Sequence, residues 1–277
     1  GNHENSRYLS GVQLDDRLRA TTELSQVCET DAILLVVPAQ AIRGIIDQLA
    51  PIVPKNVPLI CCAKGLELTT GHLMSEVIEK SLPNHPVGCL SGPTFAAESV
   101  RGMPTAVTLA IADPKLGAAM AAAISTPTFR PYISDDVVGA EVGGALKNVL
   151  AIACGIAAGI GMGENTRAAL ITRGLAEAIR LATTLGGRSE TLSGLAGLGD
   201  LAMTCASRQS RNFRFGEALG QEVPMDKILE EMGGVVEGRH TARAIIMRAA
   251  ELAIELPICQ AVDTVLNQGA GLRVTID

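Results

Sequence analysis

Runs of apolar residues separated by polar turns divide the first half of the chain into alternating strands and helices. Continuous runs rich in Val, Leu and Ile predict strands that are buried on both faces. The predicted strands are 31–38, 57–65, 87–93, 105–111 and 129–135. The predicted helices are 18–27, 39–49, 70–81 (capped by Thr69 or Thr70), 94–99 and 114–124. Strands that alternate with helices predict βαβ units and a mostly parallel sheet, an α/β fold class.

From about residue 137 the strand pattern stops and helical periodicity continues to the end of the chain. The predicted helices are 138–160, 165–185, 194–206, 211–220, 225–231, 239–253 and 257–268. We therefore expect an α/β domain over residues 1–135 and an all-α domain over residues 136–277. The cleft between two such domains is a common place for a ligand. Residues 1–14 show no periodicity.

The longest predicted helix carries a lysine at the start of its most apolar stretch. Lys147 directly precedes an uncharged run from Asn148 to Met162. That run is shorter than the ~20 residues needed to cross a bilayer, so we expect a core helix and no membrane span. Lys147 shares one helix face with small side chains, which another element can approach closely. These small side chains are Ala151, Cys154 and Ala158. Lys147 itself is either a solvated residue or a catalytic residue at the floor of a cleft.

Composition narrows the class of protein and of partner. Hydrophobic residues make up 47% of the chain, with two tyrosines, four phenylalanines and no tryptophan, so the core is built from aliphatic side chains. The net charge of −6 argues against a nucleic-acid surface but leaves room for a local basic pocket. The seven cysteines are odd in number and form no CxxC pair. They indicate reduced thiols in a cytoplasmic protein, with no disulfide framework and no metal site.

Three predicted strand ends carry residues suited to ligand binding. They are Val37-Pro38, Lys64-Gly65 and the turn Ser91-Gly92-Pro93-Thr94. Ligands of open parallel sheets bind beyond the carboxyl ends of the strands. The third turn also opens a helix, whose free N–H groups can face an anion. Each turn alone has an ordinary structural explanation, but three at successive strand ends predict a site.

The helical half contributes two further candidates. Asp200 follows the glycine-rich turn of GLAGLGDL at 194–201, where it is either a helix cap or a functional carboxylate. The segment ASRQSRNFRFG at 206–216 contains three arginines together with Ser210 and Asn212. Arginine suits bidentate contact with phosphate, although a solvated basic turn explains the segment equally well. His240 has no partner by spacing and is expected at the surface.

Eight motifs in this order resemble bacterial NAD(P)-dependent sn-glycerol-3-phosphate dehydrogenases over essentially the whole chain. They are VP at 37–38, AKGLE at 63–67, SGPTFAAE at 91–98, GALKNVLAIACGIAAGI at 144–160, NTRAALITRG at 165–174, GLAGLGDL at 194–201, SRNFRFG at 210–216 and VEG at 236–238. The resemblance implies a Rossmann-type domain at 1–135 and a helical catalytic domain at 136–277. The family's first strand, GxGxxG-type turn and helix have no match, so we expect the sequence to be an incomplete form of the protein.

The resemblance implies hydride transfer between NAD(P)H and dihydroxyacetone phosphate, which gives sn-glycerol 3-phosphate for glycerophospholipid synthesis. It makes Lys147 the general acid, Lys64 a second cation at the carbonyl, and Asp200 the group that orients Lys147 or a substrate hydroxyl. It also implies NAD or NADP as cofactor, and a homodimer is possible. The implied substrate-binding residues are Lys64, Gly92, Thr94, Lys147, Asn148, Asp200, Thr204, Ser210, Arg211 and Asn212. The implied cofactor-binding residues are Tyr8, Lys64, Ala96, Arg211, Val235 and Glu237.

Two other functions remain open at this point. One is a related two-domain dehydrogenase that acts on a hydroxy acid or sugar acid, whose carboxylate would not need a phosphate clamp at 210–212. The other is a truncated binding module without a cofactor.

Overall fold

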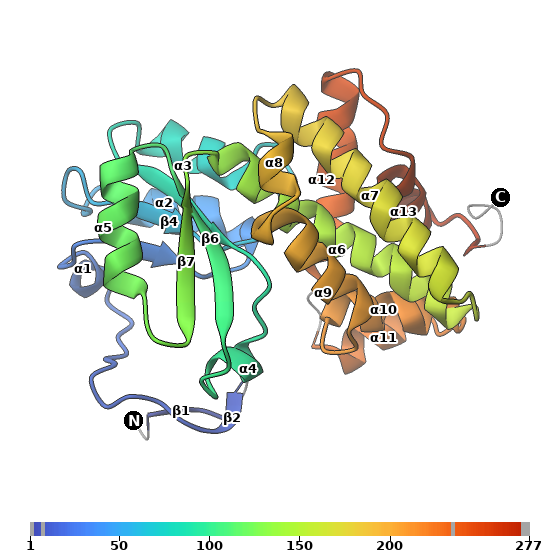
Figure 1. Ribbon diagram of the computed structural model, residues 1–277, viewed down its shortest axis with the longest axis horizontal. Coiled ribbons are helices and arrows are strands. Elements are labelled where there is room, and N and C mark those ends of the chain that lie inside the picture. The colour runs from blue at the N-terminus through green and yellow to red at the C-terminus, as the bar shows by residue number, and fades with distance from the viewer. Residues whose placement is uncertain (1–2, 7–8, 234–235, 273–277) are drawn as a thin grey trace.

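A five-stranded sheet forms the centre of the N-terminal half of the molecule (Figure 1). The computed structural model describes residues 3–6, 9–233 and 236–272. The strands are β3 (Ile33–Leu35), β4 (Leu59–Cys61), β5 (Val87–Ser91), β6 (Thr105–Ile111) and β7 (Phe129–Ser134), in the order β3-β4-β5-β6-β7. Within this sheet β5 and β6 pair antiparallel and the other neighbours pair parallel, so the prediction of a mostly parallel α/β sheet is confirmed.

Helices cover both faces of this sheet because successive side chains of a strand point to opposite sides. Leu59 and Cys61 of β4 pack with α2 (Ile42–Leu49) and α3 (Met74–Ser81). Ile60, between them, packs with α5 (Pro114–Ile124) on the other face. A strand with two apolar faces needs a continuous apolar run, which is the pattern seen in the sequence.

The structure corrects several predicted ends. Strand β3 and strand β4 are shorter than 31–38 and 57–65, because ladder pairing ends before the following turns. Helix α1 is only Leu24–Val27, and α4 is Ala96–Ser99. Helix α3 begins at Met74 and has no threonine cap, since the Thr70 hydroxyl donates to Glu67 instead. A short 3-10 helix, Ala39–Ala41, precedes α2.

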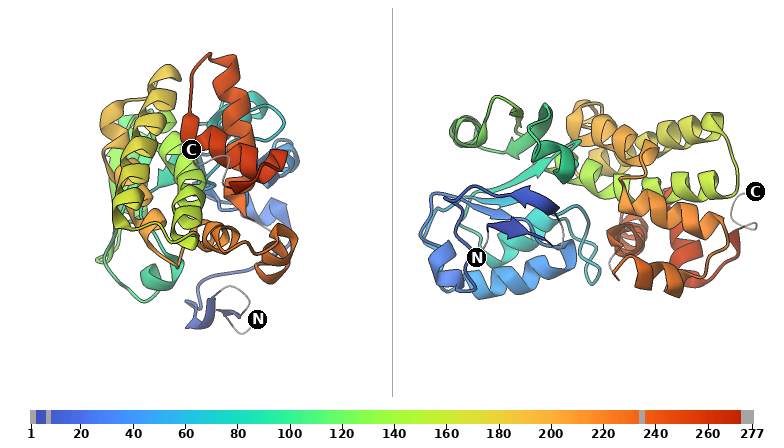
Figure 2. Two further views of the ribbon diagram at one scale, coloured as in Figure 1. Left: turned by 90° about the vertical axis from the view of Figure 1, so that its right-hand side faces the viewer. Right: turned by 90° about the horizontal axis from the view of Figure 1, so that it is seen from below.

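An antiparallel hairpin was not anticipated near the N-terminus. Strands β1 (Glu4–Asn5) and β2 (Leu9–Gln13) pair with each other and lie apart from the main sheet (Figures 1 and 2). Their residues are mostly exposed, so no alternation of apolar and polar positions marks them in the sequence.

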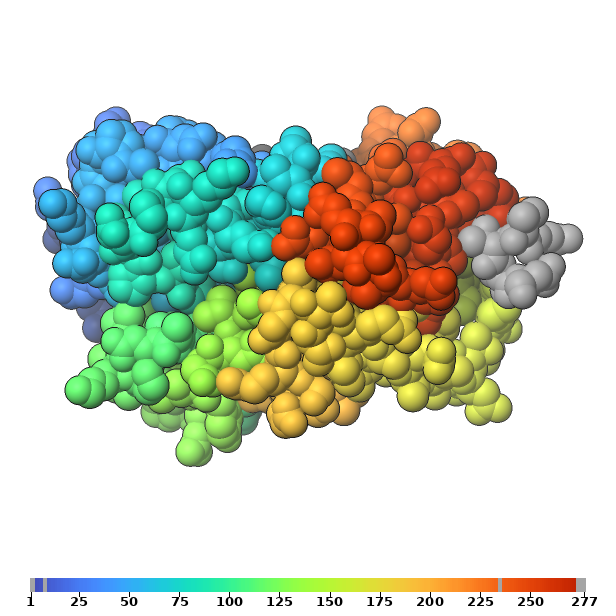
Figure 3. Space-filling view, turned by 90° about the horizontal axis from the view of Figure 1, so that it is seen from above, coloured from blue at the N-terminus to red at the C-terminus, as the bar shows by residue number. Residues whose placement is uncertain are grey.

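The C-terminal half is helical and is arranged around one central helix (Figures 1 and 2). Figure 3 shows the surfaces of the two halves meeting along a common boundary. The helices are α6 (Val137–Gly159), α7 (Glu164–Thr184), α8 (Ser189–Leu192), η2 (Leu195–Gly199, a π-helix), α9 (Asp200–Ala206), α10 (Arg211–Gly220), α11 (Met225–Glu231), α12 (Glu237–Glu251) and α13 (Pro257–Gln268). The predicted helix 194–206 is thus two elements, and α8 was not predicted.

Helices α6 and α10 cross at glycines. A Cβ atom on Gly155 would overlap the carbonyl oxygen of Phe213, and one on Gly216 would overlap that of Ile152. Gly159 and Gly220 meet in the same way. Helix α10 therefore approaches α6 at Gly155 and Gly159. These glycines lie on a face of α6 adjacent to the predicted one, which carries Lys147, Ala151, Cys154 and Ala158. The small-xxx-small spacing at 155–159 serves tight packing inside the fold.

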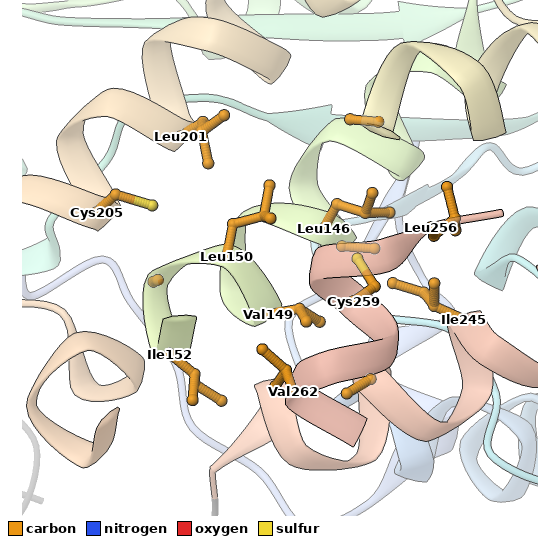
Figure 4. Packing of buried hydrophobic residues seen from close by; sticks show 14 of the residues in the cluster. Leu146, Val149, Leu150, Ile152, Leu201, Cys205, Ile245, Leu256, Cys259 and Val262 are labelled. Carbon is orange, nitrogen blue, oxygen red and sulfur yellow. The ribbon is translucent and has the colours of Figure 1, made fainter. Parts of the chain in front are cut away.

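Helix α6 is long and apolar enough to cross a membrane, yet 83% of its most apolar window is buried inside the fold. This burial is what a core helix shows. Its side chains meet those of the surrounding helices (Figure 4). The labelled residues are Leu146, Val149, Leu150, Ile152, Leu201, Cys205, Ile245, Leu256, Cys259 and Val262. All seven cysteines are free thiols, and six are buried.

Candidate active site

A buried carboxylate on α9 holds the lysine of the central helix. Asp200 is 0% exposed, and its Oδ1 lies 2.5 Å from Nζ of Lys147. Lys147 is 8% exposed, which rules out the solvated-lysine alternative. Thr204, one turn further along α9, donates its hydroxyl to the same oxygen at 3.3 Å. Buried charges in proteins are normally paired in this manner.

A second lysine reaches the same carboxylate from the sheet. Lys64 follows β4, and its Nζ lies 2.6 Å from Oδ2 of Asp200 and 3.1 Å from the carbonyl oxygen of Gly92. Two cations thus share one carboxylate, and the cluster carries a net positive charge. Such a cluster at a domain boundary suits an anionic ligand.

The environment changes the acidity of Lys147. Burial and the nearby charge of Lys64 lower the pKa of Lys147 to about 8, although Asp200 acts in the opposite direction. An amine with this pKa is present in both protonation states near neutral pH. Lys147 can therefore give or take a proton under ordinary conditions.

Glycines bring Asp200 to this position. A Cβ atom on Gly143 of α6 would overlap the carbonyl oxygen of Ala196, so the π-helix before α9 lies directly against α6. Gly197 is equally restricted by Leu192. The helix-cap alternative for Asp200 is wrong, because Gly199 occupies the cap position and the Asp200 carboxylate takes both lysines. Single-turn π-helices are frequent at functional sites.

The turn after β5 supplies a backbone acceptor. The Gly92 carbonyl oxygen receives both Lys64 and the Thr94 hydroxyl, the latter at 3.2 Å. Gly92 has φ +148°, and a Cβ atom there would lie 3.0 Å from Cα of Val107, so only glycine fits this turn. Ala96 begins α4 nearby and is exposed.

Three side-chain and backbone amides connect four segments around the lysines. The Asn148 side chain donates to the carbonyl oxygen of Lys64 at 3.1 Å. Asn212 of α10 donates to the Asn148 side chain at 2.9 Å and accepts from the N–H of Gly238 at 3.1 Å. These bonds fix the turn after β4, and α6, α10 and α12, relative to one another.

The predicted arginine cluster does not stay together. Ser210 caps α10 by accepting from the N–H of Phe213 at 3.2 Å. Arg211 donates to the carbonyl oxygen of Met232 at 2.7 Å. Arg208 instead forms an exposed ion pair with Glu217. The solvated-turn alternative is therefore correct for Arg208. Ser210 and Arg211 lie at the start of α10, next to Asn212, which bonds to Asn148.

A cavity of about 300 Å³ lies between the end of β3 and the start of α12. Glu237 is half-buried there, and burial raises its pKa. His240 is exposed, as expected, but it also lines this cavity. The other lining residues are Pro38, Ala39, Gln40, Ala41 and Thr241. The predicted residues Tyr8 and Val235 lie outside the described residues.

Ala39 and Thr241 belong to none of the motifs that mark site residues in the sequence. Both line the cavity, and Gly65 packs against both of them. Ala39 directly follows the VP motif, and Thr241 lies four positions after Glu237 on the same helix face. That spacing is the pattern that could have revealed Thr241.

Family models match nearly all of the chain. The model described as NAD-dependent glycerol-3-phosphate dehydrogenase N-terminus matches residues 1–117, and the one described as its C-terminus matches residues 136–277. A glycerol-3-phosphate dehydrogenase [NAD(P)+] from Rhodospirillum rubrum is 55% identical over 96% of this chain and 76% of the relative. One from Parvibaculum lavamentivorans is 48% identical over 97% of this chain and 80% of the relative.

Solved structures agree with these matches. The crystal structure of glycerol-3-phosphate dehydrogenase from Coxiella burnetii has a TM-score of 0.95 at 37% identity, covering 99% of this chain and 84% of that one. A D-mandelate dehydrogenase structure has a TM-score of 0.57 at 16% identity, covering 86% of this chain and 75% of that one. The second likeness shows a shared fold only.

Proposed function

The chain belongs to the NAD-dependent glycerol-3-phosphate dehydrogenase family, and we propose that it transfers a hydride between NAD(P)H and dihydroxyacetone phosphate, forming sn-glycerol 3-phosphate. The observation that carries this proposal is the buried Asp200 shared by Lys147 and Lys64. The product is a precursor of glycerophospholipids, which gives the enzyme a role in lipid metabolism. The free thiols fit a cytoplasmic location, where reducing conditions preserve them.

In the proposed reaction the ketone carbon receives a hydride while its oxygen receives a proton. Lys147 Nζ gives this proton as the general acid and takes it back in the reverse direction. Lys64 stabilises the negative charge that develops on the oxygen. Asp200 orients the Lys147 ammonium through their 2.5 Å contact. A lowered pKa supports the role of Lys147, since proton exchange is easiest near the working pH.

We assign the phosphate of the substrate to the start of α10. Ser210, Arg211 and Asn212 occupy the cap and first turn of this helix, where N–H groups and the helix dipole favour an anion. Arg211 adds a guanidinium. Asn148 ties this turn to Lys64 through its hydrogen bonds. The remaining substrate contacts in this proposal are Gly92, Thr94 and Thr204.

The cavity beside Glu237 fits the nicotinamide end of the cofactor. Its apolar walls suit a planar ring, and a carboxylate can accept from the carboxamide N–H₂. Glu237, Ala96, Lys64 and Arg211 would hold NAD or NADP, which supplies the hydride when bound. Tyr8 and Val235 complete the proposed set.

Loss of the Lys147 amine tests the proposal. In Lys147→Ala we expect the rate of NAD(P)H oxidation with dihydroxyacetone phosphate to fall by on the order of a thousandfold, because the general acid is lost. Folding should persist, since Lys64 still neutralises Asp200. Circular dichroism checks the fold, and Lys115→Ala is the matched control, because this lysine of α5 is exposed. Near-full turnover by Lys147→Ala would show that the assignment is wrong.

The phosphate assignment separates this function from that of a hydroxy-acid or sugar-acid dehydrogenase. In Arg211→Ala we expect KM for dihydroxyacetone phosphate to rise at least tenfold, the value of about one charge-assisted hydrogen bond. Arg208→Ala is the matched control and should leave KM unchanged, because Arg208 pairs with Glu217. Equal KM values in the two variants, or turnover of a 2-keto acid in place of the phosphate ester, would favour the alternative.

We also propose the domain division at 135/136 and a homodimer. The division falls between the end of β7 at Ser134 and the start of α6 at Val137. The apolar character of the helical half supports self-association into a homodimer. Light scattering of the purified chain measures its mass in solution and so distinguishes a monomer from a dimer.

A further inference from the structure

Among the described residues, the hydroxyl oxygen of Ser91 is the one buried side-chain oxygen without a hydrogen-bond partner. The residue is 2% exposed. Two nitrogen atoms, on His85 and Arg248, are also unpaired, but both of these side chains make hydrogen bonds through other atoms. The Ser91 hydroxyl has no such second atom. Leaving a buried hydroxyl unpaired costs stability, so this one points to a partner in the working complex.

The position of this hydroxyl is set by β5 and α6. Ser91 lies on the same face of β5 as Cys89, which packs against Ala140 of α6. One turn further along α6, Gly144 faces Ser91. A Cβ atom on Gly144 would lie 2.8 Å from Oγ of Ser91.

The stem of Lys64 occupies the same place. The Cβ atom that Gly144 lacks would lie 3.5 Å from Cγ and 3.8 Å from Cδ of Lys64. The Ser91 hydroxyl and the Lys64 stem therefore both lie against the same position of α6. The Lys64 ammonium also contacts the carbonyl oxygen of Gly92, the residue next to Ser91.

The Lys64 ammonium can make one more hydrogen bond than the structure gives it. It has three N–H donors, and the described acceptors are the Gly92 carbonyl oxygen and Oδ2 of Asp200. Its side chain is 20% exposed, so the terminal carbon atoms have room to rotate. A serine hydroxyl can accept such a bond.

We propose that Ser91 is a positioning residue whose hydroxyl accepts the third N–H of Lys64 during the reaction. This inference rests on the proposed role of Lys64 at the substrate carbonyl. All three N–H groups are then held by protein acceptors, and the fixed ammonium stabilises the developing negative charge on the oxygen through space by its own charge. Because that charge is greatest in the transition state, Ser91 acts on kcat and has little effect on KM.

Removal of the hydroxyl is the first test. In Ser91→Ala we expect kcat to fall about tenfold while KM stays within about twofold of the native value. Thr108→Val is the matched control, because Thr108 lies opposite Ser91 in the β5–β6 ladder and takes no part in the site. This control should keep the native kcat. A native kcat in Ser91→Ala, or an equal loss in Thr108→Val, would overturn the inference.

The substitution Gly144→Ala, on α6, displaces the same hydroxyl without changing Ser91 itself. The added methyl group forces Oγ of Ser91 out of its place but makes only ordinary contact with Lys64. We expect a fall in kcat similar to that of Ser91→Ala, and no further fall in the double variant, because both changes remove one interaction. Losses that multiply in the double variant would overturn the inference.

The native chain serves as the reference for both proposals. If it oxidises no NAD(P)H with dihydroxyacetone phosphate, the proposed function fails, whatever the variants do. If the native chain is active and Ser91→Ala matches it, only the positioning role fails.

Discussion

Lys147 lies where its positive charge is unfavourable, and this gives the reaction a defined pH dependence. Its pKa is lowered to about 8, first by burial and then by Lys64. Reduction of the ketone requires the ammonium form, so we expect its kcat to fall as the pH rises through about 8. Oxidation of sn-glycerol 3-phosphate requires the neutral amine, so its kcat should rise over the same interval. Steady-state rates in both directions across this range measure the effect, and parallel profiles would contradict it.

At the same scale, the identity of the site residues was predictable but their contacts were not. Lys147 and Asn148 stand out in an apolar helix because charged and amide side chains are seldom buried there without a partner. Their hydrogen bonds depend on neighbours from other elements. Arg208 and Arg211 look equivalent in the sequence, yet one pairs with Glu217 and the other with the Met232 carbonyl oxygen.

At the scale of elements, the crossing of α6 and α10 depends on glycine. A methyl group on Gly155 would meet the Phe213 carbonyl oxygen, so Gly155→Ala must force the helices apart. We expect a loss of about 1–3 kcal/mol in the free energy of unfolding, the usual range for overpacking. Gly44→Ala in α2 is the matched control, because no atom lies within 4 Å of its added methyl group. Alanine is the better helix former, so the control should be as stable as the native chain or more so.

Thermal unfolding of the two variants compares these effects. Equal melting temperatures would show that α6 and α10 separate without cost, contrary to the packing seen here.

Element ends were predictable where a local group defines them. Helix α5 begins at Pro114 because Asp113 accepts from the N–H groups of its first turn. Helix α13 ends before Gly269, which has φ +74°. Helix α3 was misplaced because a contact within the preceding turn decides its start, where Glu67 takes the Thr70 hydroxyl.

At the scale of the whole molecule, a buried glutamate joins the two halves. Glu141 of α6 accepts from the N–H of Ser75 in α3 at 2.9 Å and also from its hydroxyl. Burial raises the pKa of Glu141 from 4.5 to about 7, although both bonds to Ser75 oppose this shift. The nearby groups Glu76 and Glu79 add to the rise, and the thiols Cys61 and Cys89 also face this carboxylate.

This contact predicts a pH-dependent stability. The folded pKa exceeds the unfolded one, so between pH 4.5 and about 7 the native chain binds more protons than the unfolded chain. The contribution of Glu141 is then complete below pH 4.5 and is lost as the pH rises through about 7. Glu141→Gln cannot ionise, so its melting temperature relative to the native chain should increase across this interval. Melting curves at several pH values measure the difference, and a constant difference would contradict the prediction.

The sequence by itself determined the order of the five main-sheet strands and of the long helices, the division into two halves, the buried central helix and the motifs that carry the chemistry. Hydrophobic periodicity, capping residues and turn glycines act within a few positions, so they can be recognised along the chain. Only the tertiary structure decided that Asp200 takes both Lys64 and Lys147, which lie 136 and 53 positions away. It also decided that Glu141 meets Ser75, 66 positions distant. These pairs form because α6 packs at once against the sheet and against α9, and no local pattern encodes contacts across such separations.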